Sequence, residues 1–442
     1  MNQSPQPQQP YRLSTVFAVF FGVFLGLSLL KFGNPCILEK LIDRPASIFE
    51  WLLNAWPVVT GYWLLGGFAI LGLLLFPQGG RPPRGLLVLP LIWLAWQFVS
   101  ATHSVDAGLT GASLRHFAAC ITCFFIGCFV LPQAKPELFL AGLLAGLVAV
   151  IIVGWEQHFG GLAGSRKYFF AYIYPQMKTV PPELLKKMSS DRIFSTLFYP
   201  NTLAGVLLLL LPPSLATIGL QRERLTAGAR FLLVGLLGLG ALGCLYWSGS
   251  KAGWLLMLVL GLAALLRMRS TQRTKLILVG AILVVGLAGF ALRFAGYFQK
   301  GATSAAARGD YWRAAAQTAL ANPVFGTGPG TFAIPYKKIK KPGSEMARLV
   351  HNDYLQQASD SGLVGAAAYL AFIAGTLWAG WRKLARRNDW LMFSVWLGLL
   401  GWSLQSLVEF GLYIPAVAWP AFALMGWLLA TGNEFDKKPA NP

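Results

Sequence analysis

Two short polar motifs in the segment 295–361 carry the residues best suited to chemistry. The first contains Arg308 and Trp312, and the second contains His351 and Tyr354. A neutral histidine is a natural base for taking a proton from a hydroxyl near neutral pH. An arginine can stabilise the negative charge that develops on a leaving group. The pair therefore suits the transfer of a group onto a hydroxyl, with a surface or capping role as the alternative for a lone histidine.

Two other motifs place cations beside breaks between apolar runs. Arg192 lies just upstream of a Pro-Asn break, where Asn201 or Thr202 can cap the start of a helix. The N-terminus of that helix would favour an anion such as a phosphate. Ser250 and Lys251 stand in a short turn, and the compact charge of Lys251 also suits a phosphate. For both motifs the alternative is a basic residue that anchors the chain at a membrane interface.

The composition of the chain is that of a membrane protein. It has 442 residues, of which 55% are hydrophobic and 12% are charged. Soluble domains contain about 25% charged residues. Apolar windows of roughly 20 residues recur along the chain, and each is long enough to cross a bilayer as a helix. A β-barrel would instead show alternating segments of about ten residues. We therefore predict an all-α polytopic membrane protein.

These windows predict about twelve transmembrane helices, with a large, partly helical loop between the ninth and the tenth. The helices are expected at 14–31, 56–76, 85–102, 115–131, 137–155, 202–220, 229–247, 251–267, 276–294, 362–380, 390–409 and 412–430. The first nine fall in 14–294, which includes an outer loop at 156–200, and the last three fall in 362–430. We expect 1–13 to be a disordered cytoplasmic N-terminus and 431–442 to be a cytoplasmic tail.

The short loops set the predicted orientation. Basic residues cluster in the connections after even-numbered spans, and short basic loops stay in the cytoplasm. This rule puts both termini in the cytoplasm and the loops 156–200 and 295–361 at the periplasmic face. Both outer loops carry more Lys and Arg than Asp and Glu. Attraction to anionic lipid headgroups and binding of an anionic substrate are both consistent with this surplus.

The second outer loop contains further local order. Arg308 and Trp312 lie four residues apart, so they share one face of an expected amphipathic helix. Asn322-Pro323 ends this helix, and a glycine-rich turn at 326–330 follows. The turn lacks the spacing and the Gly-Lys-Ser/Thr ending of a phosphate-binding loop. No cluster of His, Cys and carboxylates predicts a metal site, and Cys120-x-x-Cys123 is interpreted as two small core residues.

Four segments with a specific order and spacing carry a family resemblance. They are Arg192…Tyr199-Pro200-Asn201-Thr202-Leu203-Ala204, Ser250-Lys251-Ala252-Gly253, Arg308…Trp312…Asn322-Pro323…Gly326-Thr327-Gly328-Pro329-Gly330-Thr331-Phe332 and His351-Asn352-Asp353-Tyr354-Leu355…Gly362-Leu363-Val364-Gly365. On this predicted topology they resemble the O-antigen ligase and O-antigen polymerase superfamily of polytopic membrane glycosyltransferases. The resemblance covers roughly Arg192 to Gly426. Beside Ser250 that superfamily usually has arginine, whereas Lys251 keeps the charge but loses the planar two-pronged donor.

The resemblance implies glycan transfer at the outer face of a bacterial inner (plasma) membrane. The donor would be a glycan on a polyprenyl (undecaprenyl) diphosphate. The acceptor would be a sugar hydroxyl of lipid A-core or of another glycan. Members of the superfamily are inverting and metal-independent, so no cofactor or metal is expected. The remaining partners would be membrane lipids, with no nucleic acid.

The resemblance also gives each candidate residue an expected role. Arg192, Lys251 and Arg308 would bind the diphosphate, because fixed cations must stabilise its charge where no metal does. His351 would activate or orient the acceptor hydroxyl, so that His351 and Arg308 are the catalytic candidates. Possible supporting residues are Asn201, Ser250, Asn352, Tyr354 and Arg313. The lysines between 337 and 341 are expected to contact headgroups or acceptor phosphates.

Three alternatives follow from the same residues. An O-antigen polymerase would use a growing glycan as acceptor, and a protein O-oligosaccharyltransferase would use Ser or Thr. From another class, a transporter of an anionic lipid or glycolipid would place charged residues in the middle of its spans. The spans of this chain are almost free of charge, with Glu409 near an outer end as a rare exception. This distribution favours chemistry at the surface over passage through the membrane.

Overall fold

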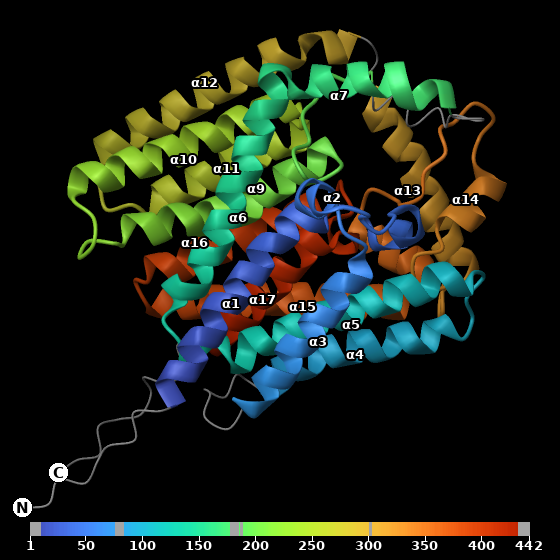
Figure 1. Ribbon diagram of the computed structural model, residues 1–442, viewed down its shortest axis with the longest axis horizontal. Coiled ribbons are helices and arrows are strands. Elements are labelled where there is room, and N and C mark those ends of the chain that lie inside the picture. The colour runs from blue at the N-terminus through green and yellow to red at the C-terminus, as the bar shows by residue number, and fades with distance from the viewer. Residues whose placement is uncertain (1–9, 76–83, 177–184, 186–188, 300–302, 432–442) are drawn as a thin grey trace, which may run out of the picture.

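The computed structural model shows a bundle of helices (Figure 1). It describes residues 10–75, 84–176, 185, 189–299 and 303–431. Within these residues every regular element is a helix, which confirms the predicted all-α class. The first helix, α1, begins at Pro10, inside the segment that was predicted to be disordered. Residues 1–9 and the predicted tail beyond 431 lie outside the described residues.

Among the described residues, seven helices are long and apolar enough to cross a membrane. They are built on α1 (Pro10–Lys31), α5 (Ala107–Phe129), α6 (Pro136–Glu156), α9 (Pro200–Gly219), α10 (Ala227–Ser248), α12 (Gln272–Gln299) and α15 (Asp353–Arg386). The shorter helices α3 (Val58–Leu74), α4 (Arg84–Ala101), α11 (Lys251–Arg267), α16 (Trp390–Gln405) and α17 (Pro415–Ala430) fall at the other five predicted spans. The chain is therefore a multi-pass membrane protein, while the count of twelve crossings stays a prediction.

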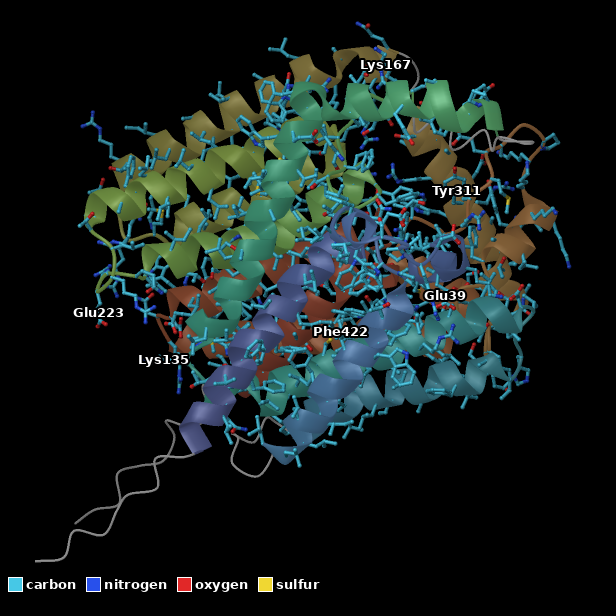
Figure 2. All side chains as sticks on the ribbon, viewed as in Figure 1. Glu39, Lys135, Lys167, Glu223, Tyr311 and Phe422 are labelled. Carbon is cyan, nitrogen blue, oxygen red and sulfur yellow. The ribbon has the colours of Figure 1, made fainter. Side chains whose placement is uncertain are left out.

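Helix α17 forms the centre of the bundle, because every one of its residues is buried. It packs against α5, α1, α16 and α15, and its Phe422 lies near the middle of the molecule (Figure 2). The approach to α5 is so close that a Cβ atom on Gly426 would meet the backbone oxygen of Phe124. All five cysteines are buried and free. The interpretation of Cys120 and Cys123 as core residues is therefore confirmed.

Helices α1 and α6 cross through two pairs of glycines spaced four residues apart. Gly22 and Gly26 of α1 face Gly142 and Gly146 of α6, and a Cβ atom on any of the four would come within 2.6 Å of the opposite backbone. Such small-xxx-small pairs let backbones approach closely where the hydrophobic effect does not drive helices together. The four glycines thus fix the distance between α1 and α6.

Substituting Gly142→Val is expected to destabilise the protein by forcing α1 and α6 apart. Overpacking of this kind costs about 1–3 kcal/mol, and a thermal unfolding midpoint in detergent would report the loss. Gly238→Val is a matched control, since nothing lies within 4 Å of a Cβ atom built there. Equal midpoints for both variants would contradict this account of the α1–α6 contact.

Several helices that lie between the predicted spans gather at one end of the bundle. These elements are α2 (Ile48–Leu53), α7 (Leu162–Tyr168), α13 (Thr303–Ala321) and α14 (Ala333–Ile339). Lys167 of α7 and Tyr311 of α13 lie at this end, whereas Lys135 and Glu223 lie at the opposite end (Figure 2). The arrangement is the one expected if the loops 156–200 and 295–361 share one face of the membrane.

The loop predicted at 156–200 is more helical than expected. Helical turns continue from the end of α6 through α7 to Gln176, with a bend at Gly160, where φ is 137°. Glycine permits this backbone conformation at little cost, so the chain changes direction at this kink and helical turns resume beyond it. The segment from Leu162 onward then runs across the end of the bundle where α13 and α14 lie (Figure 1).

Helix α15 is broken near its start at Gly362, which has φ 70° and ψ 178°. A Cβ atom at this position would meet the backbone oxygen of Val324, in the turn that follows α13. The break separates a short helix, Asp353–Ser361, from the apolar part of α15. The tenth span was predicted to begin at this glycine. The turn after α13, which contains Val324, packs against Gly362 and so holds α13 on the bundle.

Candidate functional site

Glu409 is the centre of a polar cluster that joins four segments of the chain. It lies in the turn between α16 and α17 and is only 8% exposed. Arg308 of α13 forms an ion pair with its Oε1 atom and donates from Nε to the backbone oxygen of Val408 at 3.1 Å. The Nδ1 atom of His351 lies 3.2 Å from Oε2. Asn201, at the start of α9, donates from Nδ2 to Oε1. The two catalytic candidates thus share one carboxylate.

Arg192 joins this cluster through Asn201. One guanidinium nitrogen donates to Asn201 Oδ1 at 2.8 Å, and Nε donates to the backbone oxygen of Ser248 at 2.6 Å. Ser248 ends α10, and Gly249 follows it in the left-handed conformation with φ 60°. A Cβ atom on Gly249 would come 3.3 Å from Arg192 Nε. The tight turn after α10 therefore orients the guanidinium, and glycine suits both the turn and the contact.

The prediction that Asn201 or Thr202 caps α9 is wrong. The helix begins at Pro200, and its N-cap is Tyr199, which makes no capping bond with its side chain. Proline suits the first helical position because its missing N–H has no partner there in any helix. This start leaves Asn201 in the first turn, where its side-chain amide is available to the polar cluster.

Two further cations flank the cluster. Lys251 is the first residue of α11, and its Nζ atom lies 3.7 Å from the ring centre of Tyr297. Arg293 of α12 places its guanidinium carbon 5.0 Å from the ring centre of Tyr246. Both cations are close enough to Arg192 for their charges to repel its own. The site therefore gathers positive charge from four helices or loops.

Burial and neighbouring charges shift the pKa values of Glu409 and Arg192 in opposite directions. Burial alone would raise the pKa of Glu409, but Arg308 and His351 hold that pKa below its usual value. Burial lowers the pKa of Arg192, and the charge of Glu409 opposes this shift. Glu409 is therefore an ionised carboxylate at neutral pH, and it is the counter-ion that lets the cations approach one another.

The backbone at His351 is held in an uncommon conformation. Its φ is 55°, a value that few non-glycine residues adopt and that is often found at functional sites. The N–H of Val350 donates to Gln356 Oε1 at 2.7 Å, and Trp312 Nε1 donates to the backbone oxygen of His351 at 3.4 Å. The imidazole packs edge-on against Phe410, with 4.6 Å between ring centres. The two hydrogen bonds hold the backbone around His351, and Phe410 holds its ring beside Glu409.

Three of the predicted supporting residues stabilise helices. Ser250 caps α11 and Asn352 caps α15, each by accepting a backbone N–H three residues ahead. Tyr354 donates from its hydroxyl to the backbone oxygen of Ser403 at 3.0 Å, which ties α15 to α16. The two caps position their neighbours in the sequence, since Lys251 directly follows Ser250 and His351 directly precedes Asn352.

Arg313 and the lysine run lie apart from Glu409. Arg313 and Lys341 approach the carboxylate of Asp310 at 3.9 and 3.3 Å, and Ser344 donates to the same carboxylate. The hydrogen bond from Ser344, followed by the lysine, lowers the pKa of Asp310. Because Arg313 follows Arg308 by five positions, it points from a different face of α13. The structure thus brings together Arg192, Asn201, Lys251, Arg308 and His351, but not Arg313.

Two charged residues of the site, Glu409 and Arg293, were not among the residues predicted from the sequence. Glu409 was noted only as a rare charge beside the spans, and Arg293 stands near the end of a long apolar run. The signal in the sequence was an isolated charge at the end of an apolar span, because charge is costly near the bilayer unless it has a partner.

A small cavity lies directly behind Glu409. It is lined by residues of α9 and α16 and by the turn that follows α16, including Asn201, Gln405 and Phe410. The described residues contain no group of three His, Cys, Asp or Glu side chains that could hold a metal ion. The described site offers basic side chains to a ligand, with a single carboxylate among them.

Residues 236–370 match the family model described as O-antigen ligase. The matched range runs from α10 into α15 and includes Lys251, Arg293, Arg308 and His351. The match confirms the resemblance to the O-antigen ligase superfamily, and it supports an O-antigen ligase- or polymerase-type membrane enzyme of the glycosyltransferase kind. No curated protein matches the chain.

Proposed function

We propose that this chain is an O-antigen ligase-like glycosyltransferase that works at the periplasmic face of a bacterial inner membrane. It moves a glycan from a polyprenyl diphosphate to a sugar hydroxyl of lipid A-core. The single observation that supports this reaction best is the shared carboxylate of Glu409, which binds both Arg308 and His351. One residue thereby fixes the distance between a cation for the leaving group and a base for the attacking hydroxyl.

The geometry of His351 suits the role of base. A carboxylate only accepts hydrogen bonds, so Nδ1 carries the proton in its contact with Glu409. Nε2 is then the nitrogen with a lone pair, and it can take the proton of an acceptor hydroxyl. The hydroxyl oxygen forms a bond to the anomeric carbon, and the bond from that carbon to the diphosphate oxygen breaks. Attack from the side opposite the diphosphate inverts the anomeric configuration.

The cations suit the leaving group. As the glycosidic bond breaks, negative charge develops on the diphosphate, and preorganised donors stabilise that charge without reorganising during the reaction. Arg308 shares Glu409 with His351, and Arg192 and Lys251 supply charge from two other segments. The proton on His351 later returns to solvent, and the polyprenyl diphosphate leaves as the second product.

A reconstituted transfer assay tests this function directly. The purified protein would be mixed with polyprenyl diphosphate-linked glycan and lipid A-core, without ATP and with EDTA present. We expect a lipid A-core product that bears the glycan, with the rate unchanged by EDTA and with inverted anomeric configuration by NMR. Formation of glycan polymer alone would support a polymerase. Movement of the lipid across vesicles without any new glycosidic bond would support a transporter and would overturn the proposal.

A further inference from the structure

We propose that Arg293 and Lys251 together bind the phosphate that carries the polyprenyl chain, on the membrane side of the site. The inference rests on the proposed function, because it divides the diphosphate between two groups of cations. Arg308, next to His351, would then contact the phosphate that carries the sugar. Arg293 has no role in the reaction as described so far.

The two cations share one aromatic ring. Phe294 of α12 is buried, and its ring centre lies 5.1 Å from Lys251 Nζ and 5.7 Å from the guanidinium carbon of Arg293. Tyr297 lies under Lys251, and Tyr246 lies under Arg293. An aromatic face attracts a cation and restricts its position. The two charges are therefore held near each other by rings from α10 and α12.

Among the residues that the structure describes, no carboxylate forms an ion pair with Lys251 or Arg293. The ion-paired carboxylates in this part of the chain are bound by other basic residues. Glu409 is already bonded to Arg308 and His351. Like charges at close range are unfavourable unless an anion joins them. A ligand with more than one negative charge would compensate the surplus, and a diphosphate is such a ligand.

The position of Arg293 indicates which phosphate it binds. Helix α12 lies at the edge of the bundle (Figure 1) and packs mainly on α11. Only Gly286 and Phe294 are buried along it, whereas Leu292 and Phe298 on either side of Arg293 are exposed. In a membrane these apolar side chains would face lipid, so a polyprenyl chain can lie along α12 while its phosphate meets Arg293. The competing explanation is an arginine that only anchors α12 among lipid headgroups.

Binding of polyprenyl diphosphate without glycan distinguishes these explanations. The full chain would be reconstituted in nanodiscs of zwitterionic lipid, and the dissociation constant measured for Arg293→Gln and Arg293→Lys. Loss of one charge-assisted contact predicts about tenfold weaker binding for Arg293→Gln, with most of the affinity restored in Arg293→Lys. Lys167→Gln is the matched control, because Lys167 is an exposed cation on α7 at the same end of the molecule, and it should bind as the wild type does.

Kinetics supply a second measurement that a role in folding alone would not reproduce. Arg293→Gln should raise the KM for the lipid-linked donor about tenfold, whereas kcat and the KM for the acceptor should change less than twofold. Equal binding by Arg293→Gln and Lys167→Gln would overturn the inference and leave Arg293 as a membrane anchor.

The variants Arg308→Gln and Arg192→Gln show whether such a result concerns Arg293 alone or the proposed function as a whole. If these two variants also bound polyprenyl diphosphate normally, the proposed function itself would be wrong.

Discussion

The substitution His351→Ala is expected to abolish measurable glycan transfer while leaving the protein inserted and folded. General base catalysis contributes about 10²–10⁴-fold to a rate, and no other imidazole lies in the Glu409 cluster as the structure describes it. Arg192, Lys251 and Arg308 would remain, so binding of the lipid-linked donor should persist. The transfer assay and a donor-binding measurement on the same preparation would show the two effects separately.

The positive φ of residue 351 calls for a second variant, which separates a loss of stability from a loss of the imidazole. Alanine at φ 55° is strained, whereas glycine adopts that conformation at little cost. His351→Gly should therefore restore any lost stability but not the transfer activity. His103→Ala is the matched control, since His103 stacks on Phe325 away from Glu409. Wild-type transfer by a properly inserted His351→Ala protein would remove His351 from the mechanism.

Much of the fold follows from the amino-acid sequence because the bilayer limits the choice of structure. A long apolar run must satisfy its own backbone hydrogen bonds in lipid, so it becomes a helix. The end of α13 at Ala321 and the break of α15 at Gly362 also follow from local signals, namely the Asn322-Pro323 pair and the glycine. The helical turns after Glu156 were not predicted, because that segment is too polar to resemble a span.

The site was only partly predictable, because its residues come from distant parts of the sequence and meet only through packing of the helices. Arg192, Lys251, Arg308 and His351 were selected by residue type and neighbouring motif, and the structure brings them to one place. Asn201 was assigned to a helix cap, since the exact start of α9 depends on one proline. Glu409 could not be recognised as their common partner, because it follows Arg308 by 101 residues and packing of α13 on the turn after α16 joins them.

The substitution Glu409→Gln is expected to lower the rate of transfer by at least about 10²-fold, the loss typical when one preorganised electrostatic group is removed. Glutamine has nearly the shape of glutamate, so the cavity behind it should persist. However, its neutral amide cannot neutralise Arg308, and its single oxygen cannot accept both from His351 Nδ1 and from Arg308 and Asn201 on the other side. The base would lose the partner that fixes its proton on Nδ1. Glu39→Gln is the matched control, since it also removes a carboxylate paired with an arginine, Arg115, but outside the cluster.

A double substitution tests whether Glu409 acts through its partners. If the carboxylate only positions Arg308 and His351, then Arg308→Gln with Glu409→Gln should be little slower than Arg308→Gln alone, because coupled residues do not contribute additively. Additive losses would mean that Glu409 acts on the substrate directly.

The pH dependence of stability gives an independent measurement of the same pairing. The pKa of Glu409 is lowered in the folded protein, so its ion pairs stabilise the fold above the usual carboxylate pKa and are lost as the pH falls through the lowered value. The stability advantage of the wild type over Glu409→Gln should therefore be full at neutral pH and shrink on acidification. An advantage that grew as the pH fell would contradict the assignment of Glu409 as the ionised centre of the site.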